Sequence, residues 1–294
     1  MRLFIIPFTV IIILIFSACS GGKYAHLARM GDQAYQEKDY MNALDYAVQN
    51  IAGLEQKGKK AEGSVYALAG KSAWELGKYD ISLDYLEQAR SLNYSDDEMY
   101  VCLSDCYQKI DNLSKEITAL EYYIRNYPGA KDIDTMRARL FKTCLESENF
   151  MLADSLWPLL EVQNREDPGT MTIYLKICQA TGKELLCDSL SKAILDKDPE
   201  NEPAMKWLGE KFFWQAEKRY QAEMDAYEKK RTNSQYAKLL EAFKTVTKDF
   251  KTSLGYFNKL YKLYPKAEYA QSLGNIYTRL DDQEKAKYYY NKAK

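Results

Sequence analysis

Acid–base and nucleophilic catalysis near neutral pH most often depends on histidine, and this sequence contains only one, His26. A Ser-His-Asp or Cys-His arrangement would have to use it, because the imidazole activates the nucleophile in both. His26 lies only seven residues after Cys19, close to a strongly apolar N-terminal segment. We therefore expect an exposed side chain and not a catalytic base, and the sequence does not predict an enzyme.

The tripeptide Gly70-Lys71-Ser72 ends in the same way as a phosphate-binding loop. Such a loop also needs an earlier glycine, at residue 65 of this chain, and a strand before it. Residue 65 is Val65, and the neighbouring residues have helical spacing. Nucleotide binding is not predicted, and no cofactor is expected.

The cysteines after Cys19 suggest neither a disulfide framework nor a metal site. Five are present, an odd number, and Cys102 and Cys106 are one helical turn apart, which is an unfavourable geometry for a disulfide. No histidine joins them in a zinc-binding pattern. We expect buried thiols that act as small apolar side chains, with a redox role as the alternative. The five residues are Cys102, Cys106, Cys144, Cys178 and Cys187.

The overall charge is close to balanced. The chain has 41 basic and 42 acidic residues, for a net charge of −1. Broad nucleic-acid binding depends on a basic face. Nucleic acid is therefore not an expected partner.

The N-terminal segment from Leu3 to Phe16 carries no charge, but it is shorter than the roughly 20 residues of a membrane-spanning helix. Arg2 precedes it, and the small residues Ser17 and Ala18 follow it. This order is typical of a secretory signal, so we predict a signal peptide over residues 1–18. A retained membrane span is the alternative.

The residues Phe16-Ser17-Ala18-Cys19 resemble the lipobox of bacterial lipoproteins. The resemblance implies that Cys19 becomes the lipidated N-terminus and that residues 19–30 form a tether and the start of the first repeat. Two or more acyl chains anchor a protein stably without a spanning helix. The implied location is the bacterial outer membrane, and the absence of an acidic run after Cys19 favours its periplasmic face.

Beyond residue 30, apolar residues recur at helical spacing and long strand-like alternation is absent, which predicts an all-α protein. Two segments also align with each other: Tyr40 and Ala43 correspond to Tyr79 and Ser82, and Leu-Asp-Tyr follows in both. Helical stretches end at prolines spaced by close to two periods of about 34 residues. These prolines are Pro128, Pro199 and Pro265.

This pattern resembles the tetratricopeptide repeat, a helix-turn-helix unit. The resemblance implies a helical solenoid over residues 31–200, in which small residues such as Ala43 and Ala153 let helices approach closely. Glu116 stands at one of these small-residue positions. We expect the acid to weaken the helix contact in its repeat.

The regular period is interrupted after residue 200. Apolar residues keep a 3-4 spacing from Leu208 to Tyr227 without a breaker, which predicts one long helix of roughly 40 Å within residues 201–234. Ser234 is a candidate N-cap. Helices are expected to resume near Gln235 and near Thr252, in a C-terminal repeat region over residues 235–294.

In tetratricopeptide proteins the first helix of each unit lines a concave groove. A row of lysines beside aromatic residues in that groove suits an acidic or C-terminal peptide. The alternative is that each lysine is an ordinary solvated residue paired with a nearby acid. The resemblance places five residues of this chain in the partner-binding groove: Tyr35, Lys71, Trp74, Lys142 and Lys176.

Three consecutive tyrosines, Tyr288, Tyr289 and Tyr290, lie near the C-terminus, where a terminal repeat normally carries a polar cap. Successive residues point in different directions around a helix, so at least one ring should be exposed. We predict a contact surface there, for a partner or for self-association with a second copy of the chain.

These features together favour a membrane-anchored protein–protein interaction scaffold of the bacterial envelope. It would hold envelope proteins or peptides and assist the assembly of envelope complexes. The alternative is a glycan- or peptide-capturing lipoprotein of an uptake system. In that case the ligand would meet one or more tryptophans: Trp74, Trp157, Trp207 or Trp214.

Overall fold

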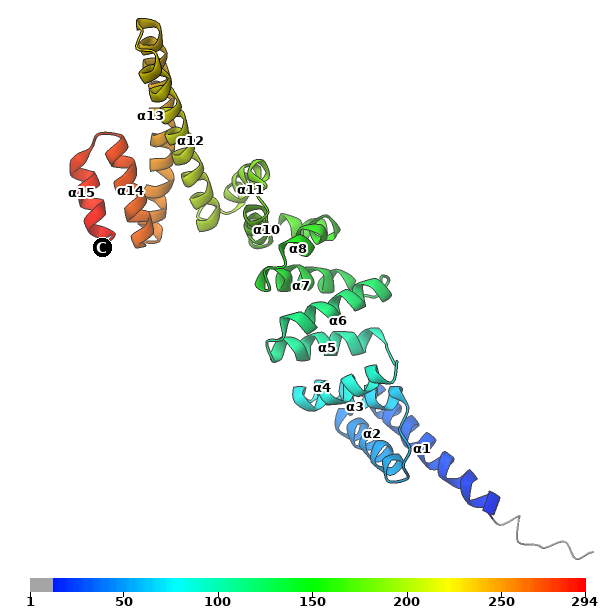
Figure 1. The fold of residues 1–294 in the computed structure, drawn as a ribbon. Coiled ribbons are helices and arrows are strands. Elements are labelled where there is room, and N and C mark those ends of the chain that lie inside the picture. Colours follow the sequence, from blue (N-terminus) through cyan, green and yellow to red (C-terminus); the bar gives the residue numbers. More distant parts are fainter. Residues whose placement is uncertain (1–12) are drawn as a thin grey trace, which may run out of the picture. The chain divides into compact units, whose positions relative to one another are not determined.

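The computed structural model describes residues 13–294, with side chains from Gly22 onward. Every regular element in this range is helical (Figure 1), and the predicted all-α class is confirmed. The chain forms two compact units, one ending at Asn149 and the other running from Phe150 to Lys294. Within each unit, consecutive helices pack against one another as hairpins.

The predicted signal peptide and the side chain of Cys19 lie outside the residues whose side chains are described. Cleavage and lipid attachment therefore stay predictions. Among the described residues, no helix is both long and apolar enough to cross a membrane.

The first unit is built from three hairpins and a further helix within its described part. α1 pairs with α2, α3 with α4, and α5 with α6, while α7 packs on α6. α3 contacts both α1 and α5, so the first helices of the three hairpins adjoin one another. The helices are α1 (Ile13–Gln36), α2 (Tyr40–Glu55), α3 (Gly63–Glu75), α4 (Tyr79–Ser91), α5 (Asp97–Lys109), α6 (Leu113–Asn126) and α7 (Ile133–Glu146).

The turn inside each of these hairpins repeats one backbone conformation. A residue with positive φ stands just before the N-cap of the second helix. The N-caps Asp39 and Asn112 then each accept a hydrogen bond from the backbone N–H three residues later. Glycine adopts positive φ freely, but lysine and aspartate do so at a cost. The three residues are Lys38, Gly77 and Asp111, with φ of 62°, 70° and 55°.

Small residues allow the paired helices to approach closely, as predicted. Ala43 and Ser82, which correspond in the repeat, are fully buried on α2 and α4. Gly70 on α3 faces Leu86 on α4, and a Cβ added to Gly70 would lie 2.5 Å from that side chain. A larger residue at this position would force the two helices apart.

Glu116 occupies a small-residue position, and the helices nevertheless pack there. Its side chain is 1% exposed, and the Nε of Arg139 on α7 donates to it at 2.7 Å. Arg139 also forms an ion pair with Asp105 on α5. The expectation that Glu116 weakens the helix contact did not take Arg139 into account. The guanidinium of Arg139 joins α5, α6 and α7 and compensates the charge of the buried carboxylate.

All five described cysteines are free and buried, which confirms the prediction of buried thiols. Cys187 takes the same small-residue position on its helix as Ala43 on α2. Burial raises the pKa of every one of these thiols, that of Cys187 to about 11. They are therefore protonated and poorly nucleophilic at neutral pH.

The described second unit combines short helices with one long hairpin and two short ones. α10 pairs with α11, α12 with α13, and α14 with α15. The elements are α8 (Phe150–Leu156), η1 (Trp157–Leu159), α9 (Val162–Glu166), α10 (Pro168–Ala180), α11 (Glu184–Lys197), α12 (Glu202–Lys229), α13 (Asn233–Leu263), α14 (Ala267–Arg279) and α15 (Gln283–Lys292).

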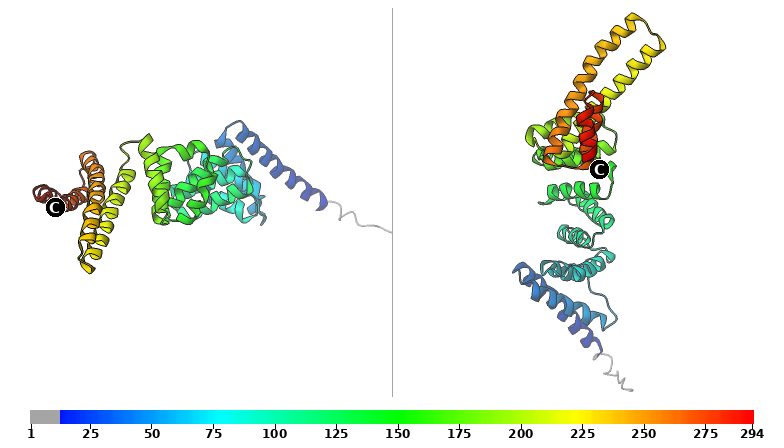
Figure 2. Two further views of the ribbon diagram at one scale, coloured as in Figure 1. Left: turned by 90° about the horizontal axis from the view of Figure 1, so that it is seen from above. Right: turned by 90° about the vertical axis from the view of Figure 1, so that its left-hand side faces the viewer.

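The long helix predicted after residue 200 is present as α12, whose 28 residues span about 42 Å. A second long helix, α13, has 31 residues and lies beside it (Figure 2). The expected helix start near Thr252 was wrong, because α13 runs through this residue without a break. The Thr252 hydroxyl does not cap a helix; it donates to the Lys248 carbonyl within α13 at 3.0 Å. Ser234 is not the N-cap; Thr232 is, and it accepts a hydrogen bond from the Gln235 N–H.

The long hairpin is joined by polar contacts as well as by its apolar core. The Ser253 hydroxyl donates to the Gly209 carbonyl at 2.8 Å, and Asp249 forms an ion pair with Arg219 at 3.5 Å. α14 packs against α13, which buries apolar side chains from all three helices in one cluster. That cluster contains Met205, Ala216, Val246, Phe250, Phe257, Leu260, Tyr269, Leu273 and Ile276.

Candidate functional site

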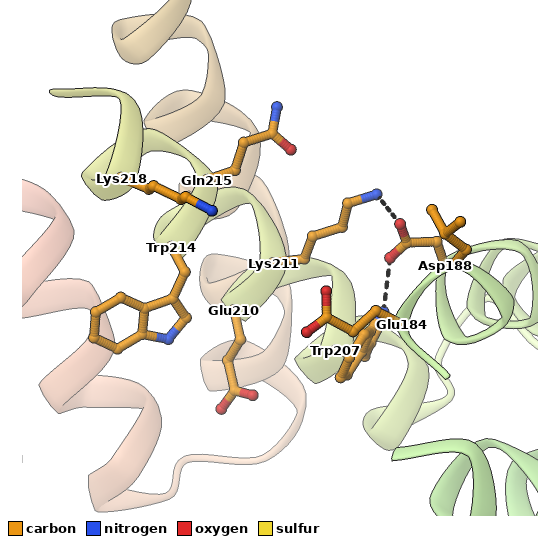
Figure 3. Close-up of a pocket in the computed structure, with 9 residues that line it drawn as sticks. Glu184, Asp188, Trp207, Glu210, Lys211, Trp214, Gln215 and Lys218 are labelled. Carbon is orange, nitrogen blue, oxygen red and sulfur yellow. Dashed lines mark hydrogen bonds and ion pairs between the residues drawn. The ribbon is translucent and has the colours of Figure 1, made fainter. Parts of the chain in front are cut away.

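A cleft of about 470 Å³ lies between the N-terminal half of α11 and the first part of α12 (Figure 3). Its walls combine two indole rings with carboxylate, amide and ammonium groups. The lining residues, which define the α11–α12 cleft, are Glu184, Leu185, Asp188, Trp207, Glu210, Lys211, Trp214, Gln215 and Lys218.

The start of α12 positions its contribution to the cleft. Asn201 caps the helix by accepting a hydrogen bond from the Ala204 N–H at 3.2 Å, and its amide donates to the Thr172 hydroxyl on α10 at 3.0 Å. From this fixed start, Trp207 and Trp214 lie two turns apart on one stripe of the helix, separated by about 10.5 Å along its axis.

Asp188 on α11 is the polar junction of the cleft. It accepts a hydrogen bond from the Trp207 indole Nε1 at 2.9 Å and forms an ion pair with Lys211 (Figure 3). Both partners lie on α12, so the carboxylate links the two helices. Asp188, Trp207 and Lys211 therefore hold each other in place and shape the wall.

Several other side chains of the cleft are open to a ligand, although the Gln215 amide donates to Asp249 at 3.3 Å. Leu185 is 86% exposed and Trp214 66% exposed, which is unusual for such large apolar groups. Burial raises the pKa of Glu210, a change that the charge of Lys206 opposes. Within the described part of the chain, Glu184, Glu210 and Lys218 form no ion pair. Apolar contact and charged hydrogen bonds are thus available to one bound segment.

The structure brings together two of the predicted groove residues, Tyr35 and Lys71, in a closed cluster. The Lys71 ammonium lies 2.9 Å from Glu98 and 3.1 Å from Asp96, and 5.5 Å from the Tyr35 ring centroid. The Tyr35 hydroxyl donates to Glu98 at 2.5 Å, and the Tyr94 hydroxyl donates to Asp96 at 2.8 Å. We call these five residues the Lys71 cluster.

The electrostatics of the Lys71 cluster follow from its own acids. Burial alone would lower the pKa of Lys71, but the charges and hydrogen bonds of Asp96 and Glu98 outweigh it and raise that pKa. Burial and the bond to Asp96 raise the pKa of Tyr94 to about 12. Lys71 is therefore paired with two nearby acids, although its side chain is only 14% exposed and is not solvated, and its part in binding a partner stays a prediction.

The remaining predicted groove residues do not join this cluster. Trp74 is half-buried on α3, and its indole N–H has no hydrogen-bond partner among the described residues. Lys142 on α7 and Lys176 on α10 are exposed, belong to different units and pair with no described acid. Their part in binding a partner stays a prediction.

The C-terminal tyrosines point in different directions, as expected. Tyr288 is 54% exposed, whereas Tyr289 stacks on Tyr277 with ring centroids 5.5 Å apart. Tyr290 packs against Gly274 and donates to the Asn275 side chain at 3.1 Å. The contact surface assigned to these tyrosines stays a prediction, and only Tyr288 is largely free to make it.

Several cleft residues were missed from the sequence, although Trp207 and Trp214 were considered as ligand contacts. No sequence motif includes Glu184, Leu185 or Glu210. The available signal was the spacing of Trp207, Lys211, Trp214 and Lys218, which share one helical stripe. Nothing in the linear order showed that the start of α11 would face that stripe.

No group of three or more His, Cys, Asp or Glu side chains with a metal-binding arrangement occurs among the described residues. The cleft offers a binding surface, and the Lys71 cluster is an internal ion network. Neither contains a nucleophile paired with a base.

Comparisons with known proteins find distant similarity to solved tetratricopeptide-repeat structures but no close relative. No family model and no curated protein matches the sequence. Among solved structures, YrrB, described as a tetratricopeptide-repeat protein with an unusual peptide-binding site, is 10% identical with a TM-score of 0.47; the match covers 61% of this chain and 89% of YrrB. A repeat protein from Parabacteroides merdae is 11% identical with a TM-score of 0.43, and the match covers 92% of both chains. A double mutant of MamA RS-1 is 13% identical with a TM-score of 0.47, over 67% of this chain and 92% of MamA.

Proposed function

We propose that this protein is a non-enzymatic scaffold that binds a protein or peptide partner in the α11–α12 cleft. The observation that carries the proposal is the exposure of Leu185 and Trp214 beside the cleft. Exposed aromatic anchors next to a pocket are a common feature of protein-binding sites. The partner is expected to insert an apolar side chain beside Trp214 and to place a cationic group near Glu184 or Glu210.

The proposal also includes the cell envelope as the place of action. The sequence features behind it are the N-terminal apolar segment and the lipobox-like residues ending at Cys19. An acylated Cys19 would hold the helical units at the periplasmic face of the outer membrane, where the captured partner would be an envelope protein. Assistance in assembling envelope complexes is one specific form of this role.

The test of the cleft is site-specific photo-crosslinking in intact cells. A photoreactive residue replaces Leu185, which is 86% exposed and therefore tolerant of substitution. We expect one discrete cross-linked protein or peptide band, which Trp214→Ala reduces at least about tenfold, as for an interface anchor residue. The matched control places the same photoreactive group at Met151, which is 75% exposed on α8 and does not line the cleft.

Equal capture from positions 151 and 185, or capture that persists in the Trp214→Ala variant, would contradict a binding site in the cleft. The anchor is tested separately by Cys19→Ala, which should abolish incorporation of a labelled fatty acid into the protein. Equal labelling of that variant would contradict lipidation at Cys19 without affecting the cleft.

Glycan capture is a second candidate, favoured by the pairing of Trp207 and Trp214 in one cleft beside carboxylate and amide groups. Aromatic rings and polar groups together suit a sugar, which has both apolar and hydroxyl-bearing faces. Titration with soluble envelope oligosaccharides should quench tryptophan fluorescence if this reading holds. Quenching that disappears in Trp214→Ala would favour the glycan, and unchanged emission would exclude the sugars tested.

A further inference from the structure

A second surface collects positive charge where α1 enters the first unit. Two cations lie on α1, and three lie in the loop between α2 and α3. All five side chains are exposed, and none forms an ion pair with a described acid. These residues, which we call the α1 basic face, are Lys23, Arg29, Lys57, Lys59 and Lys60.

Specific contacts hold the α2–α3 loop against α1. The Tyr24 hydroxyl donates to the Gly53 carbonyl at 2.8 Å, and the Asn50 side-chain amide donates to the Tyr24 carbonyl at 2.8 Å. The Lys57 ammonium lies 4.9 Å from the Tyr24 ring centroid. The end of α2 and the start of the loop are therefore attached to the beginning of α1.

A groove of about 760 Å³ runs along the same junction, and both Arg29 and Lys60 line it. Lys59 and Lys60 share a neighbouring groove with Glu55. Lys60 lines both grooves, so Arg29, Lys59 and Lys60 lie on adjoining surface, and Lys57 is next to them because it contacts Tyr24.

This face has a surplus of positive charge in a chain that is almost neutral overall. The acids that line the two grooves are Glu55 and Glu62, and neither forms an ion pair with the five cations in the described part of the chain. Some other lysines pair across helices, as Lys183 does with Asp154 and Lys206 with Glu268. The unpaired ammonium groups of the α1 basic face keep their charge for an external anion, and their flexible stems suit a diffuse anionic surface.

α1 continues without interruption from this face toward the N-terminus (Figure 1). Cys19 precedes Lys23 by four residues, which corresponds to about 6 Å along a helix axis. A lipid at Cys19 would hold Lys23 within a Debye length of the bilayer, about 8 Å at physiological salt, and Arg29 about 15 Å along the helix from the lipid. This placement rests on the proposed anchor, whereas the affinity of the face for anions does not.

We propose that the α1 basic face binds the phosphate headgroups of anionic phospholipids and thereby orients the first unit on the membrane. The charge surplus, the lack of internal acid partners and the position next to the predicted anchor all favour a bilayer as the occupant. Basic residues next to a membrane segment gain affinity from anionic lipids in an additive way.

The test is co-sedimentation of the full-length protein with vesicles of phosphatidylcholine alone and of three parts phosphatidylcholine to one part phosphatidylglycerol. The apolar N-terminal segment contributes to both measurements, so their ratio isolates the charge effect. We expect the wild-type protein to partition at least about tenfold more strongly into the anionic vesicles, since each nearby cation contributes roughly a fivefold gain. Added salt should abolish the difference.

In the variant K57E/K59E/K60E, the ratio of partitioning into anionic vesicles to partitioning into neutral vesicles should fall close to one, because three of the five cations are reversed. The matched control is K229E/K230E/R231E, which reverses three exposed cations at the end of the long hairpin and should keep the wild-type ratio. Circular dichroism of both variants should be unchanged, because all six side chains are exposed.

Three results would overturn the proposal. The first is a wild-type ratio near one. The second is an equal loss in both triple variants, which would show a non-specific charge effect. The third is competition by inorganic phosphate at constant ionic strength, which would indicate a site for a free anion. None of these three results depends on Cys19. A failure of the proposed lipid anchor would therefore not be mistaken for a failure of this proposal.

Discussion

The Lys71 cluster in the first unit and the α11–α12 cleft in the second use the same kinds of side chain with opposite results. In the Lys71 cluster, the lysine, the two acids and the tyrosines bond to one another. In the cleft, Asp188, Trp207 and Lys211 are bonded similarly, but Glu184, Glu210, Trp214 and Leu185 remain available. Residue type alone therefore does not mark a binding site; what matters is whether the fold has already supplied each group with a partner.

This contrast also changes which lysines of the predicted groove are free to bind a partner. An acidic peptide would have to displace Asp96 and Glu98 before it could reach Lys71. Lys142 and Lys176 are exposed and pair with no described acid, so they remain the better candidates among the predicted lysines. Three substitutions test the distinction between closed and open groups.

The largest effect is expected for Arg139→Met, which leaves Glu116 buried without its cation. Loss of one partner from a buried ion pair typically costs about 3–5 kcal/mol, and Arg139 also joins Asp105. Because the chain has two units, the measurement is hydrogen exchange of the α6 and α7 amides, which reports local stability. The double variant E116A/R139M should recover much of the loss; no recovery would show that Arg139 acts through packing alone.

A moderate effect is expected for Lys71→Met, which leaves Asp96, Glu98 and the Tyr35 hydroxyl without their common cation. The expected loss is about 1–2 kcal/mol, as for a hydrogen-bonded charged group. Lys142→Met is the control, since an exposed and unpaired lysine should change stability by less than about 0.5 kcal/mol. Hydrogen exchange in α3 and α5 measures both, and equal effects would contradict the closed cluster.

The pH dependence of this contribution has a definite sign. The pKa of Lys71 is raised in the folded protein, so its stabilisation is fully present below the ordinary lysine pKa of about 10.4. It is lost as the pH rises through the higher value of the folded state. The difference in stability between wild type and Lys71→Met should therefore shrink only in strongly alkaline solution.

The smallest effect on stability is expected for Trp214→Ala, although the same change should reduce partner capture at least about tenfold. The side chain is 66% exposed, so its loss should alter stability by less than about 0.5 kcal/mol. Chemical denaturation followed by circular dichroism measures this change. A loss of several kcal/mol would show that Trp214 is a structural contact and would remove the contrast with the Lys71 cluster.

The repeat pattern was readable from the sequence because it depends on local chemistry. Small residues such as Ala43 and Ser82 mark helix crossings, and the 3-4 spacing after Leu208 marks α12. The second long helix was not readable in the same way. A helix start was expected near Thr252, but the Thr252 hydroxyl bonds to the Lys248 carbonyl within α13, and the next hydroxyl, of Ser253, bonds to the Gly209 carbonyl on α12.

The sequence by itself determined the all-α class, the positions of most hairpins, and the burial of the cysteines. These follow from periodicity and residue size, which act over one or two helical turns. Only the tertiary structure decided that Lys71 is neutralised, that Glu116 is offset by Arg139, and that Trp207 and Trp214 face the start of α11. The reason is physical: hydrogen bonds and ion pairs depend on distances of about 3 Å between atoms far apart in the chain, and periodicity does not specify those distances.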